Sequence, residues 1–438
     1  MNTSEKYTLA SEVIDHALKN GAQQASVSIN ENTSCNIEIR DQKIDNLVQS
    51  SSNGLNLSLY VDNRYSSHNT NRLNQAELHH FIEEAITATK YLAEDKFRSL
   101  PDADLYYKGG GADLNTFDKS VESFETRSKI DLAKQVLDEA YQKDERIISV
   151  SSYYSDNISR GILVTSNGFK GDYAYTGVSL YATVSVKSDK GRPSDYWFET
   201  SNFFDKLKKT GIGERALART IKKIGPEKVA SGKYTMIVEN RVAPNILSAV
   251  YSSLQGSSIY NKQSFLSGKS GKPVASPVLD ISDDPLITGA SGSRLFDEEG
   301  LKSVKRPVIE NGILRNFYIN TYYGKKLGIA PTTGSKSNAI FRLGKKGLDD
   351  LVKSTKKGIL VTGFNGGNFN GTTGDFSYGI EGFFIENGTI THPVSEMNIS
   401  GNMNQVLFNL VEVGNDIIEG LSDQIPSLMF DSIDFSGI

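Results

Sequence analysis

The chain has 438 residues, of which 38% are hydrophobic and 23% are charged, as in an ordinary globular protein long enough for two domains. Its formal net charge is −4 and its charges are mixed along the chain. This balance argues against nucleic acid as the main partner, because phosphate binding requires a basic surface.

The first 18 residues lack the basic start and unbroken apolar stretch of a signal peptide, so we expect none. No apolar run approaches the length of about 18 residues that a membrane span needs. Cys35 is the only cysteine, which permits no internal disulfide. We therefore expect a cytoplasmic protein without a membrane partner.

Periodicity predicts the elements of the amino-terminal part. Apolar residues at helical spacing predict helices over 10–18, 78–86, 130–141 and 204–223, and Asn74 with Glu77 predicts a capping box before the second. Strict alternation predicts strands over 35–39, 55–61 and 178–186. Gly225-Pro226 ends this region and a new strand begins at Lys233, so we place the domain boundary near Lys228.

The carboxyl-terminal part is richer in glycine and in short strands. Residues 358–394 predict a strand, a glycine loop over Gly363 to Gly374, a strand, a tight turn and a strand. Asn387-Gly388 and Asn311-Gly312 predict hairpin turns, since both residue types tolerate positive φ. The predicted fold is α+β, with a mixed α/β domain (1–227) and a mostly antiparallel, glycine-rich β domain with a few helices (228–438).

A helix with an unusual surface is predicted from Ala243. Pro244 suits its first turn. One stripe of this helix is apolar, whereas another holds Asn245, Ser248, Ser252 and Gln255, without a charge or a metal ligand. A serine nucleophile needs a nearby base, and His392 is the only histidine in the second half. We expect the small side chains to admit another backbone, a partner subunit or an extended peptide.

Other motifs favour structural roles. The five histidines lack the spacing of a zinc site. The G-x-G-x-x-A sequence at 211–216 follows a helical pattern, whereas a dinucleotide site follows a strand. Two acidic clusters, Asp280 to Asp284 and Asp297 to Glu299, match turn chemistry, although a cation site or an acid/base pair stays open.

Long segments of the second half, including "SSIYNKQSFLSGKSGKPVASPVLDISDDP" and "TTGDFSYGIEGFFIENGTITHPVSEMNISGNM", resemble the TldD/PmbA family, in which some members are described as modulators of DNA gyrase. The resemblance covers nearly the whole chain. TldD-like members carry H-E-x-x-x-H before an L-E-G step, and a cysteine near the C-terminus. Aligning "LQG" (254–256) with that step places Leu247 and Ser252 at the histidine positions and Ser248 at the glutamate position.

The resemblance therefore implies a PmbA/TldE-like subunit without catalytic residues, cofactor or zinc of its own. It would pair with a zinc-bearing TldD-like homologue in a complex that trims unstructured peptides. We expect its peptide groove to involve six residues: Ser248, Ser252, Gln255, Tyr260, Gly366 and Gly367. The alternatives are a homodimeric binding or regulatory protein, and weak peptidase activity of its own through the acidic clusters and a recruited ion.

Overall fold

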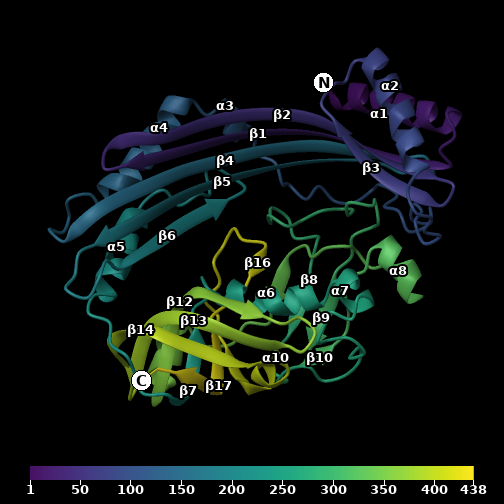
Figure 1. The fold of residues 1–438 in the computed structure, drawn as a ribbon. Coiled ribbons are helices and arrows are strands. Elements are labelled where there is room, and N and C mark those ends of the chain that lie inside the picture. Colours follow the sequence, from purple (N-terminus) through teal and green to yellow (C-terminus); the bar gives the residue numbers. More distant parts are fainter. Residues whose placement is uncertain (438) are drawn as a thin grey trace.

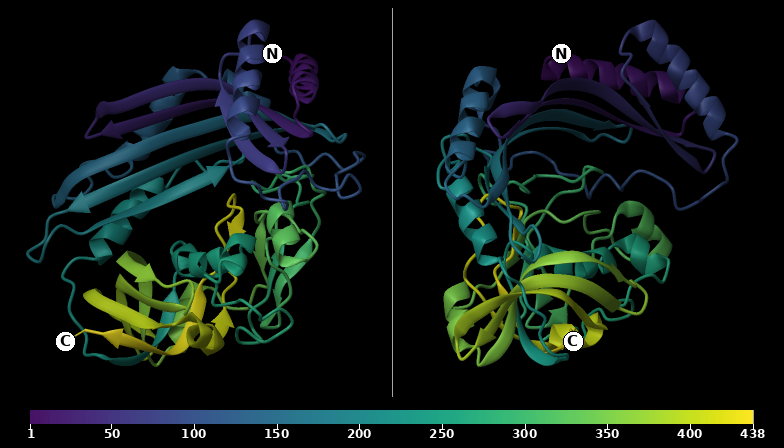
Figure 2. Two further views of the ribbon diagram at one scale, coloured as in Figure 1. Left: turned by 45° about the vertical axis from the view of Figure 1, so that its right-hand side comes forward. Right: turned by 60° about the vertical axis from the view of Figure 1, so that its left-hand side comes forward.

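The computed structural model describes residues 1–437, and it shows two halves facing each other. A long curved sheet of the amino-terminal half (1–227) arches over the carboxyl-terminal half (228–437) (Figure 1). The two further views show α1 and α2 on the outer side of this sheet and the carboxyl-terminal half on its inner side (Figure 2). No helix among residues 1–437 is both long and apolar enough to cross a membrane.

The curved sheet has six strands in the order β3-β2-β1-β4-β5-β6, and all neighbours are antiparallel. The predicted alternation is confirmed: Ile37, Leu57 and Val184, for example, are buried on its outer face. The strands are β1 (Gln24–Arg40), β2 (Lys43–Val61), β3 (Arg64–Thr70), β4 (Ile147–Thr165), β5 (Lys170–Val186) and β6 (Ser194–Ser201).

Helices cover the outer face and form two separate hydrophobic cores with it. Ala10 and Ile14 of one helix and Leu78 and Ile82 of the next pack on one end of the sheet. Val136 and Ala216, from two later helices, pack on the other end. The helices are α1 (Thr3–Lys19), α2 (Gln75–Thr89), α3 (Lys119–Ser123), α4 (Thr126–Asp138) and α5 (Ile212–Lys222).

One predicted helix start is confirmed and another differs from the structure. Asn74 is the N-cap of α2 and accepts from the Glu77 backbone, as predicted, although the complete capping box with both bonds is at Asn2 and Glu5 of α1. The helix predicted from residue 204 begins only at Ile212, because Gly211 has a φ of 79°. The Glu139 carboxylate accepts from the backbone N–H groups of Gly211 and Gly213, both at 2.8 Å, and so fixes the start of α5.

The carboxyl-terminal half contains two sheets around one large core. The larger sheet has the order β14-β13-β12-β7-β17-β15, and an added short β14–β17 pairing closes the first five of these strands into a ring. Its strands are β7 (Gly232–Val238), β12 (Lys357–Phe369), β13 (Asp375–Glu386), β14 (Thr389–Asn402), β15 (Leu410–Val413) and β17 (Leu428–Ser436). The smaller sheet holds β8 (Ile281–Asp283), β9 (Arg306–Glu310), β10 (Ile313–Leu314), β11 (Ala339–Phe341) and β16 (Asp423–Gln424).

Short helices complete this half: α6 (Ala243–Ser253), α7 (Gly256–Tyr260), α8 (Thr321–Leu327), α9 (Leu348–Ser354), α10 (Met403–Val406) and the 3₁₀ turn η1 (Leu407–Asn409). Both predicted hairpin turns are confirmed, with φ values of 48° and 78° at Asn387-Gly388 and 48° and 74° at Asn311-Gly312. The predicted glycine loop is partly wrong: β12 continues through Gly366 and Gly367 as an irregular strand paired with β13, and the loop is confined to 370–374.

A buried ion network joins the halves beside α5. Arg219 bonds both oxygens of Glu239 at 2.6 and 2.7 Å, and its Nε lies 3.3 Å from Asp195. Lys223 bridges Asp195 and Glu381. The side chains of Asp195 and Glu239 are only 3% and 4% exposed, so each carboxylate needs its basic partners to stay charged at little cost. The ion pairs therefore stabilise the junction between the halves.

Candidate functional site

Helix α6 presents the predicted small polar face to solvent. Ser248 and Ser252 are exposed, whereas Leu247 is buried in the main core of the carboxyl-terminal half. The Ser248 hydroxyl donates to the Asn245 carbonyl at 2.7 Å, and the Ser252 hydroxyl donates to the Ala249 carbonyl at 3.0 Å. The helix therefore satisfies its own hydroxyl groups.

These three side chains do not fit a zinc ion. Zinc takes thiolate, imidazole and carboxylate ligands, whereas Leu247 offers no donor atom and the two serines offer neutral hydroxyls. Across residues 1–437, no group of three or more His, Cys, Asp or Glu side chains is arranged to hold a metal.

The structure places the other predicted groove residues apart from one another. Gln255 stands at the N-cap position of α7, without a capping bond from its side chain, and its backbone forms an isolated bridge with Tyr318. Tyr260 lies against Tyr323, with ring centroids 6.0 Å apart, and Lys326 lies over its ring. Gly366 and Gly367 lie in the bulged part of β12, where both have positive φ and are exposed.

One surface pocket joins α6 to the irregular end of β12. It has a volume of about 780 Å³, and its lining includes Ser252, Ser258, Asn368 and Phe369. Of the six predicted groove residues, only Ser252 lines it. The pairing of β12 with β7 covers residues 358–361 and ends at Val361, before β12 reaches this pocket. Within the described chain, residues 363–369 thus have no strand on that edge.

The acidic clusters make the structural contacts that their turn sequences predict. Asp283 accepts from the backbone and hydroxyl of Ser337 at 2.7 and 2.6 Å and pairs with Arg306 at 3.1 Å. Asp297 accepts from the backbone N–H groups of Glu299 and Leu301. These carboxylates hold loops in place.

Burial raises the pKa of both Asp297 and Glu299. The Glu299 carboxylate accepts from the backbone and hydroxyl of Thr321 at 2.8 and 2.9 Å. Burial raises the pKa of Glu299 to about 7, against the stabilising bonds from Thr321 and with a further contribution from the charge of Asp297. This side chain lies where the loop around Leu301 bridges to Tyr106 of the amino-terminal half.

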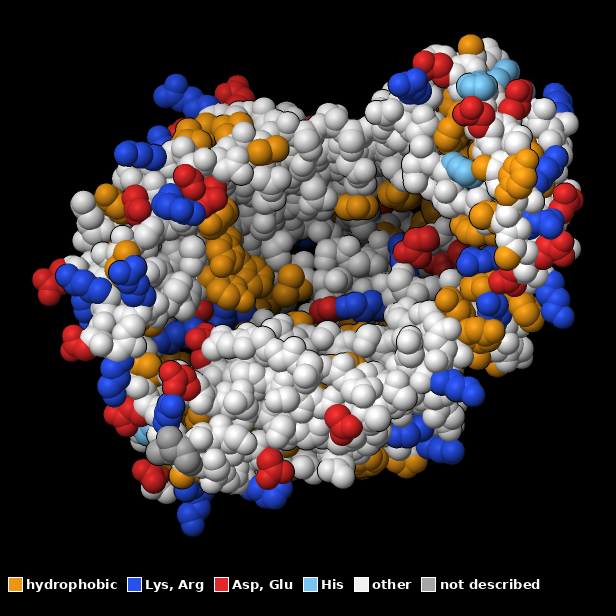
Figure 3. Space-filling view, in the orientation of Figure 1, with side chains coloured by type: hydrophobic (Ala, Val, Ile, Leu, Met, Phe, Trp, Pro, Cys, Tyr) orange, Lys and Arg blue, Asp and Glu red, His pale blue; other side chains and the backbone are white. Residues whose placement is uncertain are grey.

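A cavity of about 770 Å³ lies between the inner face of the curved sheet and the carboxyl-terminal half, and we call it the inter-half cavity. The sheet contributes Asn30, Tyr173 and Tyr175, and the opposite side contributes the segment 291–298 and Lys336. In the space-filling view a hollow opens between the halves, with hydrophobic side chains on its left wall and charged side chains around it (Figure 3).

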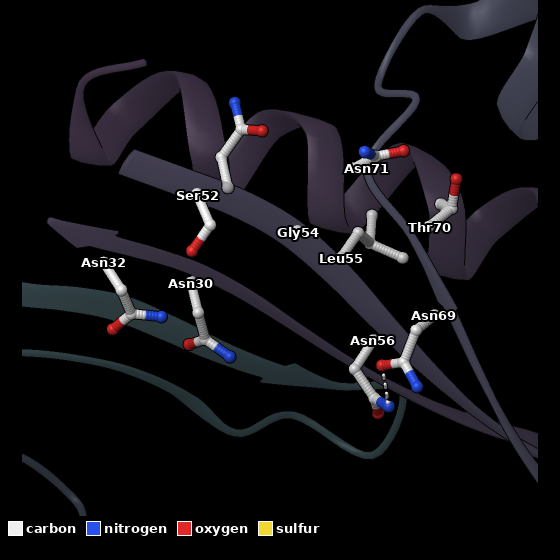
Figure 4. Close-up of a pocket in the computed structure, with 10 residues that line it drawn as sticks. Asn30, Asn32, Ser52, Gly54, Leu55, Asn56, Asn69, Thr70 and Asn71 are labelled. Carbon is white, nitrogen blue, oxygen red and sulfur yellow. Dashed lines mark hydrogen bonds between the residues drawn. The ribbon is translucent and has the colours of Figure 1, made fainter. Parts of the chain in front are cut away.

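The part of the inner face formed by residues 26–36 of β1 is polar and uncharged. On β1 its residues are Ser26, Ser28, Asn30, Asn32, Ser34 and Asn36, which alternate with outer-face residues. Several bond across strands: Ser159 donates to Asn32 at 2.6 Å and Ser155 to Asn36 at 2.7 Å. Asn30 also lines a shallow pocket of about 500 Å³, where Asn56 bonds Asn69 (Figure 4).

The sequence reasoning missed this inner face and the cavity. The alternation of serine and asparagine over 26–36 was a usable signal, since a strand with one apolar face shows its other face at every second residue. The cavity gave no comparable signal because its lining comes from segments far apart in the sequence.

Three domain models of one family match the chain: PmbA/TldA metallopeptidase domain 1 over 25–89, the central domain over 119–224 and the C-terminal domain over 231–437. A protein of Haemophilus influenzae named "Metalloprotease PmbA homolog" is 31% identical over 430 residues, covering 97% of this chain and 94% of that protein.

Two solved structures have the same fold. A candidate modulator of DNA gyrase from Bacteroides thetaiotaomicron is 47% identical, with a TM-score of 0.98 and complete coverage of both chains. TldE from Thermococcus kodakarensis has a TM-score of 0.87 over 98% of this chain and 100% of that chain; at 18% identity it shows likeness of fold alone.

Proposed function

The chain belongs to the PmbA/TldD metallopeptidase family, and from this premise we propose that it acts as the subunit without zinc in a TldD/TldE-type complex that processes unstructured peptides. The observation that carries the proposal is the composition of α6. Leu247, Ser248 and Ser252 stand where the resemblance expects two zinc ligands and a general base.

The chemistry of these replacements supports a loss of catalysis. Bound zinc lowers the pKa of water from about 15.7 to about 7, and a positioned general base contributes roughly 10²–10⁴ in rate. The serine hydroxyls on α6 donate to carbonyls of their own helix, so they supply neither effect. In this proposal, the zinc and the base come from the TldD-like homologue.

The pocket beside α6 supports a role in holding the peptide. An extended peptide can add to an open strand edge through main-chain hydrogen bonds, and residues 363–369 of β12 present such an edge. Ser252 and Phe369 line the adjoining pocket and would meet its side chains.

A peptide-cleavage assay tests the proposal. A long unstructured peptide is incubated with this protein alone, with an H-E-x-x-x-H homologue from the same genome alone, and with the mixture, while zinc is measured in each protein. Cleavage that needs the homologue and increases in the mixture, with zinc only in the homologue, is expected. Cleavage by this protein alone, with stoichiometric metal bound to it, would overturn the proposal and favour a metal site at the acidic clusters.

A bulky substitution tests the placement of the groove. Ser252→Trp fills the pocket beside α6 from an exposed position, so it should lower peptide processing by the complex while the fold is kept. Ser257→Trp, a half-buried serine outside that pocket's lining, is the matched control. Unchanged processing by the Ser252 variant would show that the peptide lies elsewhere.

A second candidate function is a homodimeric binding or regulatory protein without a peptidase partner. The description of the Bacteroides thetaiotaomicron protein as a candidate modulator of DNA gyrase supports the regulatory role. The two candidates differ in their partner. Co-purification with a TldD-like homologue favours the role in the peptidase complex. A stable homodimer that does not bind the homologue favours the regulatory role.

A further inference from the structure

The inter-half cavity has an aromatic wall. Tyr173 and Tyr175 stand two residues apart on β5 and are 38% and 43% exposed. Their rings are stacked, with centroids 6.2 Å apart and planes 13° apart, and the Tyr173 hydroxyl donates to Asn30 at 2.8 Å. This bond fixes one ring against the sheet, so the pair presents a preformed aromatic surface to the cavity.

Carboxylates outnumber cations in the cavity lining. The acidic side chains that face the cavity are Asp113, Asp297 and Glu298, and its basic residues are Arg294 and Lys336. Asp172 also borders the cavity, but its carboxylate is on the outer face of the sheet, where it accepts from Tyr7 of α1. Both cations already have acidic partners: Arg294 pairs with Glu298 at 3.0 Å, and Lys336 pairs with Asp423. The lining therefore favours a positively charged ligand over an anion.

Two of these carboxylates keep one oxygen free for a ligand. Among residues 1–437, Asp113 bonds the Asn115 backbone, and Glu298 bonds Arg294 and Ser335, in each case through a single oxygen. The charge of Glu298 also contributes to raising the pKa of Tyr173, after burial and Tyr175. Glu298 therefore lies near the aromatic wall of the same cavity.

We propose that the inter-half cavity binds the lysine or arginine side chain of an extended peptide. The stacked tyrosine faces attract the cation through their ring quadrupoles, and the free carboxylate oxygens of Glu298 and Asp113 accept its N–H groups. The inference deepens the proposed function by naming a substrate class, and it rests on that function only in taking the ligand to be a peptide.

The test measures binding of three peptides to this protein alone by titration calorimetry. The peptides are short, unstructured chains of glycine, serine and asparagine with a central lysine, glutamine or glutamate. The lysine peptide should bind about tenfold more tightly than the glutamine peptide at low salt, and the preference should shrink at about 0.15 M salt. Equal binding of these two peptides, or tighter binding of the glutamate peptide, would overturn the proposal.

Two variants locate the preference. Tyr175→Ala and Glu298→Gln should each reduce the lysine-to-glutamine preference at least about threefold. The matched controls are Tyr91→Ala, at a tyrosine that is 86% exposed, and Glu84→Gln, on the outer helix α2. Tyr175 is exposed, so its variant should fold. A lysine preference unchanged in both folded cavity variants would also overturn the proposal.

The outcome separates this inference from the proposed function. Binding is measured without a partner, whereas the proposed function is judged by cleavage in the mixture. Cleavage without any lysine preference rejects only the cavity site. A lysine preference without cleavage in the mixture rejects only the role in the peptidase complex.

Discussion

The exposed face of α6 and the inter-half cavity both offer a surface to a peptide, yet they differ in how they are built. The α6 face comes from one helix of 11 residues, and its serine hydroxyls are satisfied within that helix. The cavity takes residues from β1, β5 and several loops of both halves, and two of its carboxylates, Asp113 and Glu298, each keep a free oxygen. The surface that the family resemblance identifies therefore has its hydroxyl groups already bonded. The polar groups with hydrogen-bonding capacity left for a ligand lie in the cavity, where the fold brings together residues that are distant in the sequence.

The largest difference should appear when the junction of the halves is broken. Arg219→Ala leaves Glu239 and Asp195 buried with fewer partners, so the free energy of unfolding should fall by about 3–5 kcal/mol. The cavity should lose its lysine preference, whereas the α6 face should keep its structure. Urea denaturation can be followed by the fluorescence of Trp197, whose ring centroid lies 5.6 Å from the Arg219 guanidinium.

Arg315→Ala is the matched control, since its pair with Glu310 is 39% and 45% exposed and should contribute less than about 1 kcal/mol. Similar small losses in both variants would mean that the ion network does not hold the halves together.

The stability of the protein should also depend on pH through Glu299, which is next to the cavity residue Glu298. The folded state raises its pKa from 4.5 to about 7, so between these values the folded state holds a proton that the unfolded state has released. Stability from this group is therefore complete below pH 4.5 and is lost as pH rises to about 7, by roughly 3 kcal/mol at about 1.4 kcal/mol per pKa unit.

Glu299→Gln keeps an oxygen for Thr321 and removes the titration. Urea unfolding of both proteins from pH 4.5 to 7.5 should show the wild type losing stability relative to the variant as pH rises. Glu12→Gln, at an exposed position of α1, should leave the wild-type pH dependence unchanged. Parallel curves for the wild type and Glu299→Gln would refute the shift.

The smallest effect is expected on α6. Ser248→Ala removes an exposed hydroxyl that bonds only the helix carbonyl of Asn245, and alanine has the higher helix propensity. The free energy of unfolding should rise by up to about 0.5 kcal/mol, as measured in urea. A loss above about 1 kcal/mol would show that this face makes contacts which the single chain does not reveal.

Local patterns predicted most of the fold because they depend on neighbouring residues. Alternation placed Leu55 to Val61 on one face of β2, and Asn387-Gly388 formed the predicted turn. Predictions failed where a distant group decided the outcome. Glu139, on another segment, starts α5 at Ile212, and pairing with β13 keeps the glycines of β12 in a strand.

The same limit applies to the site. Ser252 was accessible to sequence reasoning and lines a real pocket, but Gln255 and Tyr260 are used in contacts with Tyr318 and Tyr323. Tyr175 and Glu298 stand more than a hundred residues apart, so their meeting across the cavity depends on the junction of the halves.

The position of β17 in the larger sheet sets the order in which the chain can complete its fold during synthesis. β7 lies in the middle of that sheet, between β12 and β17, so one of its edges cannot pair until residues 428–436 have been synthesised. At about 5–20 residues per second, the ribosome needs roughly 10–40 s to make the intervening 200 or so residues. The curved sheet, complete at Ser201, is finished first and is present when the carboxyl-terminal half closes beneath it.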